Sequence, residues 1–110
     1  MSHGLSPQTV ERIVTVMARH SRIERVVIYG SRAKGNYRPG SDIDLTLFGD
    51  GLDFSLRVRL LSELDDLLLP YQFDLTLFAD LTHPGLIDHI RRVGVVLYER
   101  SSISIGNSQS

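Results

Sequence analysis

The stretch Val26-Val27-Ile28-Tyr29-Gly30-Ser31 is followed, after ten further residues, by Asp42-Ile43-Asp44-Leu45-Thr46-Leu47-Phe48. The first run is β-branched and aromatic until a glycine stops it, which is typical of a buried strand. The second run alternates apolar and polar residues, so it predicts a strand with one face in a core. A glycine–serine turn and two carboxylates therefore lie at the ends of two strands, and this arrangement governs the fold and function that we expect.

The segments around these two strands predict three helices and two more strands. We expect helices at 7–20, 54–69 and 82–93, and strands at 23–29, 42–48, 73–78 and 95–98. The helix after the 42–48 strand favours parallel pairing with the 73–78 strand, whereas the short 31–41 connection permits an antiparallel pair. The chain is therefore expected to be α/β (α+β), with helices packed on a small mixed sheet.

The composition describes an ordinary single domain. The chain has 110 residues, 42% of them hydrophobic and 23% charged, and a net charge of -1. We interpret 1–100 as one domain and the polar segment 101–110 as a flexible tail. The lack of cysteine excludes disulfides and thiolate sites and is compatible with the cytoplasm. Without a membrane-length apolar run, a signal-peptide pattern or a basic overall charge, neither a membrane nor a directly bound nucleic acid is expected as a partner.

One short repeat links two of the strands. Residues 44–50 match residues 74–80 at six of seven positions. No longer repeat surrounds them, so we interpret them as similar strands lying side by side rather than as a duplication. In that arrangement Asp44 and Asp74 face the same space, and the site would hold three carboxylates.

These carboxylates have the chemistry of a divalent-metal site. Asp42 and Asp44 share one face of a strand and lie roughly 6.6 Å apart along it. Mg²⁺ prefers oxygen ligands and completes its shell with water and substrate phosphates. Three carboxylates can hold two such ions about 4 Å apart, a spacing suited to in-line displacement at phosphorus. The alternative is that Asp42, Asp44 and Asp74 are only solvated strand ends, but their alternation with apolar residues favours a site.

The glycine–serine turn has the chemistry of a phosphate site. Glycine at position 30 lets the backbone approach a ligand, and the N–H groups of the turn with the Ser31 hydroxyl can bind an anion. Arg32, Lys34 and Arg38 would add positive charge opposite a triphosphate. Ser41 is most simply a cap or turn residue, and it is also counted among the candidates for binding the phosphates. The histidines show no metal-ligand spacing, and the group His83–Asp88–His89 is interpreted as the surface of an amphipathic helix.

A competing motif is present in the second strand. Asp42-Ile43-Asp44-Leu45-Thr46 fits the DxDx(T/V) pattern of haloacid-dehalogenase-like phosphatases, in which the first aspartate is a nucleophile. That pattern needs an apolar strand leading into the first aspartate, and here residues 36–41 are turn-like. A phosphatase with Asp42 as nucleophile is therefore the least favoured hypothesis.

The segments Tyr29 to Gly35 and Ser41 to Leu45 resemble the nucleotidyltransferase superfamily that includes DNA polymerase β, and more closely its minimal (MNT-type) members. The family signature is Gly-Ser, ten residues, Asp-x-Asp and a third aspartate on a later strand. Gly30-Ser31, Asp42, Asp44 and Asp74 match it, and the resemblance covers about residues 23–98.

The resemblance implies a polymerase β-like fold and nucleotidyl transfer, in which a hydroxyl attacks the α-phosphate of a nucleoside triphosphate. By analogy, Asp42 and Asp44 hold two Mg²⁺ ions, and Asp74 completes the metal site and helps to deprotonate the hydroxyl. Gly30 and Ser31 would hold the β- and γ-phosphates of the substrate, which is expected to be ATP.

The resemblance also suggests a partner. Minimal members are often encoded beside a helical HEPN protein, sometimes as toxin and antitoxin, and some add AMP to that partner. The leading hypothesis is therefore an antitoxin that transfers AMP to a HEPN-type protein. A catalytically silent antitoxin that only masks its partner is the alternative, and the question of a homo-oligomer stays open.

Overall fold

The protein is described by a computed structural model that covers residues 4–30 and 42–100. The elements are α1 (Pro7–Ala18), β1 (Arg25–Tyr29), β2 (Ile43–Phe48), α3 (Phe54–Asp65), β3 (Phe73–Leu77), the short 3-10 helix η1 (Phe78–Asp80), α4 (Pro84–Val93) and β4 (Val95–Glu99). The strands form one sheet in the order β3-β2-β1-β4. Strand β1 is antiparallel to β2 and β4, while β2 and β3 are parallel, so the predicted mixed sheet is confirmed.

The helices begin where side-chain caps are available. The Ser6 hydroxyl accepts a hydrogen bond from the Thr9 N–H at the start of α1. The Asp53 carboxylate does the same for the Leu56 N–H of α3 at 2.9 Å. The predicted end of the second helix is wrong: α3 ends at Asp65, and Leu68 adopts a left-handed φ of 57° before Pro70 is reached.

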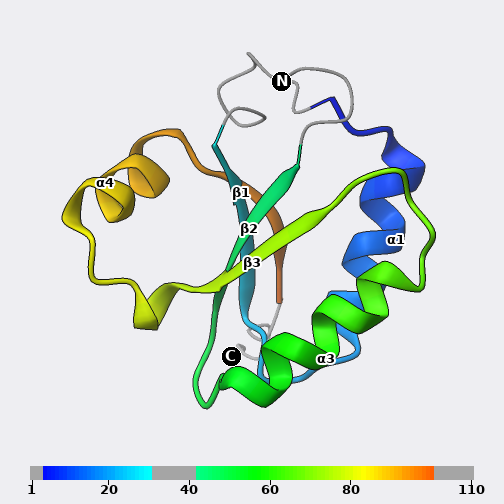
Figure 1. The fold of residues 1–110 in the computed structure, drawn as a ribbon, viewed down its shortest axis with the longest axis horizontal. Coiled ribbons are helices and arrows are strands. Elements are labelled where there is room, and N and C mark those ends of the chain that lie inside the picture. The colour runs from blue at the N-terminus through cyan, green and yellow to red at the C-terminus, as the bar shows by residue number, and fades with distance from the viewer. Residues whose placement is uncertain (1–3, 31–41, 101–110) are drawn as a thin grey trace, which may run out of the picture.

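The main core lies between the sheet and the pair α1 and α3, which cover the same face (Figure 1). It takes its side chains from alternate positions of β2, so that Ile43, Leu45 and Leu47 are all fully buried. On the helix side it is completed by Leu60 and Leu64 among others, as the helical spacing of the leucines predicts. In the part of the chain that the structure describes, no helix is long and apolar enough to cross a membrane.

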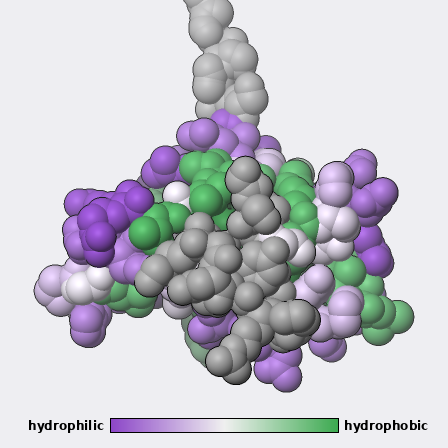
Figure 2. Space-filling view, turned by 90° about the horizontal axis from the view of Figure 1, so that it is seen from above, coloured by the Kyte–Doolittle hydropathy of each residue, from purple (hydrophilic) through white to green (hydrophobic). Residues whose placement is uncertain are grey.

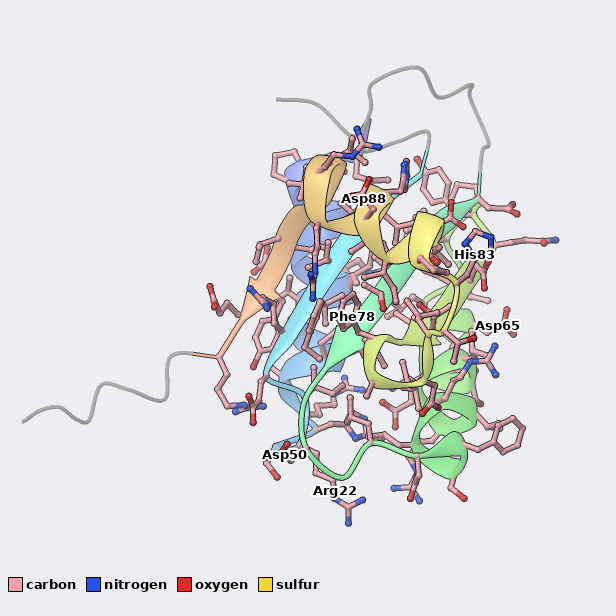
Figure 3. The ribbon with its side chains drawn as sticks, turned by 90° about the vertical axis from the view of Figure 1, so that its left-hand side faces the viewer. Arg22, Asp50, Asp65, Phe78, His83 and Asp88 are labelled. Carbon is pink, nitrogen blue, oxygen red and sulfur yellow. The ribbon has the colours of Figure 1, made fainter. Side chains whose placement is uncertain are left out.

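The opposite face of the sheet is covered by α4, which contradicts the prediction that β2 has a single core face. Thr46 is fully buried on this side, and the Phe48 ring stacks on Phe78 with 4.4 Å between ring centroids. Figure 3 shows α4 across this face, with Phe78 beneath it. The difference arises because a segment more than thirty residues away returns over the strand, which the period of β2 alone does not reveal.

Helix α4 is amphipathic. Its inner side buries Ile90 against Val27 and Tyr29. Its outer side carries exposed charged residues, and Figure 2, which looks onto the end of the sheet where β1 stops, shows a strongly hydrophilic surface over this helix at the left. One face of α4 therefore contacts the sheet while the other is open to solvent.

Candidate active site

Three polar side chains form a row across the sheet. Tyr29 on β1 pairs with Asp44 on β2, and Asp44 pairs with Asp74 on β3. Neighbouring strands lie about 4.8 Å apart and paired residues point to the same side, so this row faces the layer that contains α4. The similar segments 44–50 and 74–80 are predicted to lie side by side as strands. The parallel register of β2 and β3 confirms this prediction.

The row lies where β1 ends and where β2 and β3 begin, at the top of Figure 1. Asp42 immediately precedes β2 and is exposed. The two-residue period of an extended chain places it on the side of Asp44. The structure thus brings the three predicted carboxylates to one end of the sheet.

The carboxylates interact electrostatically. The pKa of Asp44 is raised, chiefly by burial and then by the negative charges of Asp74 and Asp42. A positive charge on the nearby His89 would act in the opposite direction and lower it. Because each added negative charge disfavours ionisation of the next, a cation placed among the carboxylates would be strongly favoured.

The three carboxylates suit Mg²⁺ chemically, although their side chains do not converge. Within 4–30 and 42–100, no three His, Asp or Glu side chains are close enough together to hold a metal ion. Mutual repulsion separates such groups when no cation compensates their charge. Asp42 and Asp74 are exposed, so their rotamers are free to turn toward Asp44. An oxygen-only donor set of this kind fits a hard divalent cation.

Gly30 brings the turn after β1 into contact with this site. It has a φ of +78°, which favours glycine, and a Cβ atom added there would lie 2.4 Å from Asp44 Oδ2. The glycine therefore serves both the backbone conformation and the close approach of the chain to a carboxylate. The sequence predicts a close approach of this glycine to a ligand, and in the structure its close neighbour is Asp44.

The Gly30 N–H is already engaged. It donates a hydrogen bond to His89 Nε2 at 3.2 Å. This N–H is therefore not free to donate to a phosphate. The other predicted nucleotide-binding residues, Ser31, Arg32, Lys34 and Ser41, lie outside the described residues together with Arg38.

Sequence reasoning missed two residues of the site. The sequence predicts Tyr29 only as part of a strand, yet it is 7% exposed and lies beside Asp44 on the neighbouring strand. Its pKa is raised by burial first; a hydrogen bond with Thr76 opposes the shift, and the charges of Asp44 and Asp74 add to it. The Tyr29 phenol therefore stays protonated, and no signal in the sequence marks it, because an aromatic residue at a strand end is commonplace.

The interpretation of His89 as helix surface is wrong. Its side chain is half-buried, and its ring meets Tyr29 edge-on with centroids 6.3 Å apart. His83 instead caps α4 by accepting a hydrogen bond from the Leu86 N–H, and Asp88 pairs with Arg92. The group His83–Asp88–His89 thus has three separate roles, and the partner of His89 becomes evident only once α4 is placed on the sheet.

Comparisons with known proteins agree with this geometry. Residues 11–103 match the protein family described as Polymerase beta, Nucleotidyltransferase. A search of curated proteins finds no match.

Several solved structures share the fold. The crystal structure of a toxin–antitoxin with AMP-PNP contains a chain that superposes with a TM-score of 0.70 at 20% identity, over 84% of this chain and 74% of that one. A chain in the complex of a tri-AMPylated Shewanella oneidensis HEPN toxin with an MNT antitoxin has a TM-score of 0.65 at 18% identity, over 84% of this chain and 71% of that one. A chain of the MntA-HepT toxin–antitoxin crystal structure has a TM-score of 0.66 at 18% identity, over 86% of this chain and 74% of that one. These likenesses confirm the predicted nucleotidyltransferase fold.

Proposed function

The chain belongs to the polymerase beta nucleotidyltransferase family, and on that premise we propose that it transfers AMP from ATP to a hydroxyl group of a partner protein. The observation that carries the proposal is the alignment of Asp44 with Asp74 on adjacent parallel strands, with Asp42 two residues before Asp44 and the Gly30 turn in contact with it. Carboxylates beside a glycine turn provide for a metal-bound triphosphate.

The proposed reaction is an in-line displacement at phosphorus. The acceptor hydroxyl oxygen forms a bond to the α-phosphorus, and the bond from that phosphorus to the bridging oxygen breaks, so that pyrophosphate leaves. Asp74 takes up the proton of the hydroxyl. Ser31, Arg32, Lys34 and Ser41 bind the nucleotide, so catalysis rests mainly on positioning and on compensation of charge.

Asp42, Asp44 and Asp74 would hold two Mg²⁺ ions in this reaction. Bound Mg²⁺ would compensate the negative charge of the triphosphate and of the leaving pyrophosphate. Ionised Asp44 is destabilised by its neighbours without such a cation, which supports this assignment.

The partner that we propose is a helical protein of the HEPN type, for which this chain would be the antitoxin. The support is the fold, which is shared with chains of toxin–antitoxin structures, one of which contains an AMPylated HEPN toxin. The reaction is expected in the cytoplasm, where ATP is available, in keeping with a sequence without cysteine.

The test is transfer of radioactive label from α-labelled ATP to the HEPN-type partner in the presence of Mg²⁺. Wild type is expected to label the partner, and Asp42→Asn and Asp44→Asn to lose roughly 10²- to 10³-fold of the rate, since each removes a charge needed in the transition state. Asp50→Asn is the matched control, because Asp50 is an exposed aspartate at the end of the sheet away from the site (Figure 3).

Each hypothesis predicts a different outcome. If wild type and the two variants are equally silent but all neutralise the partner, the enzymatic proposal is wrong and the chain is a masking antitoxin. A covalent phosphoryl group on Asp42 would instead identify the phosphatase reaction.

A further inference from the structure

The side chain of His89 on α4 reaches Gly30, the residue that follows β1. His89 Nε2 accepts a hydrogen bond from the Gly30 N–H at 3.2 Å, across 59 residues of sequence, in a partly buried position. This contact joins α4 directly to the backbone of Gly30. The family signature of glycine, serine and aspartates does not contain it.

The contact fixes the protonation of the imidazole. A backbone N–H is always a donor, so the ring nitrogen that receives it must be unprotonated. His89 is therefore neutral, with its proton on Nδ1. A histidine that served only as a polar surface residue would have no such requirement.

The ring is held in place by its surroundings. It lies edge-on to Tyr29, with centroids 6.3 Å apart and planes at 79°. The next residue, Ile90, is 3% exposed and anchors α4 on the sheet beside Val27. The acceptor nitrogen is thus placed by packed neighbours rather than by a mobile side chain.

The position of Gly30 makes this contact relevant to nucleotide binding. Gly30 has the left-handed φ of +78° and lies against Asp44, so the position of its peptide determines how close the backbone comes to this carboxylate. A hydrogen bond at this N–H restrains the peptide plane before any ligand arrives. Such preorganisation improves binding because less ordering remains to be done on association.

We propose that His89 is a positioning residue for the nucleotide site, in which it holds the Gly30 backbone beside Asp44 by accepting the Gly30 N–H. This inference rests on the proposed function, because it makes Gly30 and Asp44 part of the site that binds ATP. It gives α4, whose outer face is open to solvent, a direct connection to the nucleotide site.

The variants that test it are His89→Ala, which removes the acceptor, and His89→Gln, whose side-chain oxygen can reach the position of Nε2. The matched control is His83→Ala, which removes the cap of the same helix but leaves the glycine turn untouched. Thermal unfolding of all three shows how far each change destabilises α4 in general.

Two measurements follow on the full chain. The first is the affinity for ATP with Mg²⁺: we expect His89→Ala to weaken it about 3- to 10-fold, the effect of one lost hydrogen bond, and His89→Gln to restore most of it. The second is NMR without nucleotide: the ¹⁵N shifts of His89 should show an unprotonated Nε2, and the Gly30 amide should exchange faster in His89→Ala. His83→Ala should change neither.

The results separate this inference from the function on which it rests. If wild type binds ATP and His89→Ala binds it equally well, or if Nε2 carries the proton, the positioning role is wrong whatever the enzyme does. If the affinities and exchange rates change as expected but no AMP is transferred, the positioning role is upheld and the proposed reaction fails.

Discussion

At the scale of single residues, the site depends on a few atoms in close contact. Asp42, Asp44, Asp74 and Gly30 could be identified in the sequence because their types and spacing carry chemistry that a solvated loop does not need. Their proximity is now explained by strand register and by the lack of a side chain at Gly30. His89 could not be identified, since only the packing of α4 on the sheet brings it to the turn.

Gly30→Ala tests the contact between the turn and Asp44. The new Cβ would meet Asp44 Oδ2 at 2.4 Å, so the carboxylate or the turn must shift. Because a displacement of about 1 Å can cost roughly 10²-fold in rate, we expect label transfer to fall by about that factor. The left-handed φ should also cost about 1–2 kcal/mol of stability, measured by urea unfolding.

Gly51→Ala is the control for this change. Gly51 has a similar φ of +75°, but the Cβ atom added there would lie 3.8 Å from the Arg22 side chain, an ordinary van der Waals distance. It should lose a comparable amount of stability and keep its activity. Equal activity in the two variants would contradict the role assigned to the Gly30–Asp44 contact.

Asp44→Asn tests the electrostatics of the site. The pKa of Asp44 is raised in the folded protein, by burial first and then by Asp74 and Asp42. Between the ordinary carboxyl pKa and this raised value, the folded state binds more protons than the unfolded chain, so the free energy of unfolding falls as the pH rises. We expect Asp44→Asn to be more stable than wild type at pH 7, and the difference to disappear below the ordinary carboxyl pKa.

Urea unfolding at several pH values measures this difference. Mg²⁺ provides an independent check, since a ligand that binds only the folded state stabilises it. Mg²⁺ should stabilise wild type more than Asp44→Asn. An Asp44→Asn variant that is no more stable than wild type at pH 7 would show that the burial of this charge is of no consequence.

At the scale of elements, most of the fold follows from local signals. The caps at Ser6 and Asp53 mark helix starts, and the helix between β2 and β3 predicts their parallel pairing. What the sequence did not show is the burial of the second face of β2, where Thr46 and Phe48 lie under α4 and η1. The alternation of apolar and polar residues along a strand indicates which of its faces is more apolar, but it does not indicate whether a distant helix covers the other face.

The end of α3 provides a prediction at this scale. Leu68 follows the helix with a left-handed φ of 57°. Its side chain is 89% exposed, so packing of that side chain does not offset the strain of the backbone. Leu68→Gly should therefore stabilise the protein by about 0.5–1 kcal/mol, because relief of the strain exceeds the added freedom of the unfolded chain. Leu68→Ala is the control, since it keeps the strain and should change stability little. A destabilised Leu68→Gly, measured by urea unfolding, would contradict this reading of the turn.

At the scale of the whole molecule, we propose that residues 1–100 are the folding unit. Arg100 closes the described part of the chain: its N–H donates to the Glu24 carbonyl at 2.8 Å, and its guanidinium donates to the carbonyls of Ile23 and His20. These bonds join the end of β4 to the segment between α1 and β1. The site, at the other end of the sheet, does not depend on them directly.

If 1–100 is the folding unit, removal of residues 101–110 should change the free energy of unfolding by less than about 0.5 kcal/mol, the usual size of a change that leaves the core and the hydrogen bonds of a domain intact. Arg100→Ala should cost about 2 kcal/mol, because two charge-assisted hydrogen bonds to partly buried carbonyls are lost. Urea unfolding of the truncated chain, of Arg100→Ala and of wild type measures these differences in the free energy of unfolding. A truncated chain as unstable as Arg100→Ala would place the domain boundary further along the sequence.

The most direct test of the central claim uses two batches of ATP, labelled at the α- or the γ-phosphate, with the HEPN-type partner and Mg²⁺. Nucleotidyl transfer predicts that α-label appears on the partner and γ-label in pyrophosphate, and that Asp44→Asn abolishes both. Label from the γ-position on the partner, or α-label transferred equally by wild type and Asp44→Asn, would contradict the assignment of this row of carboxylates as a nucleotidyltransferase site.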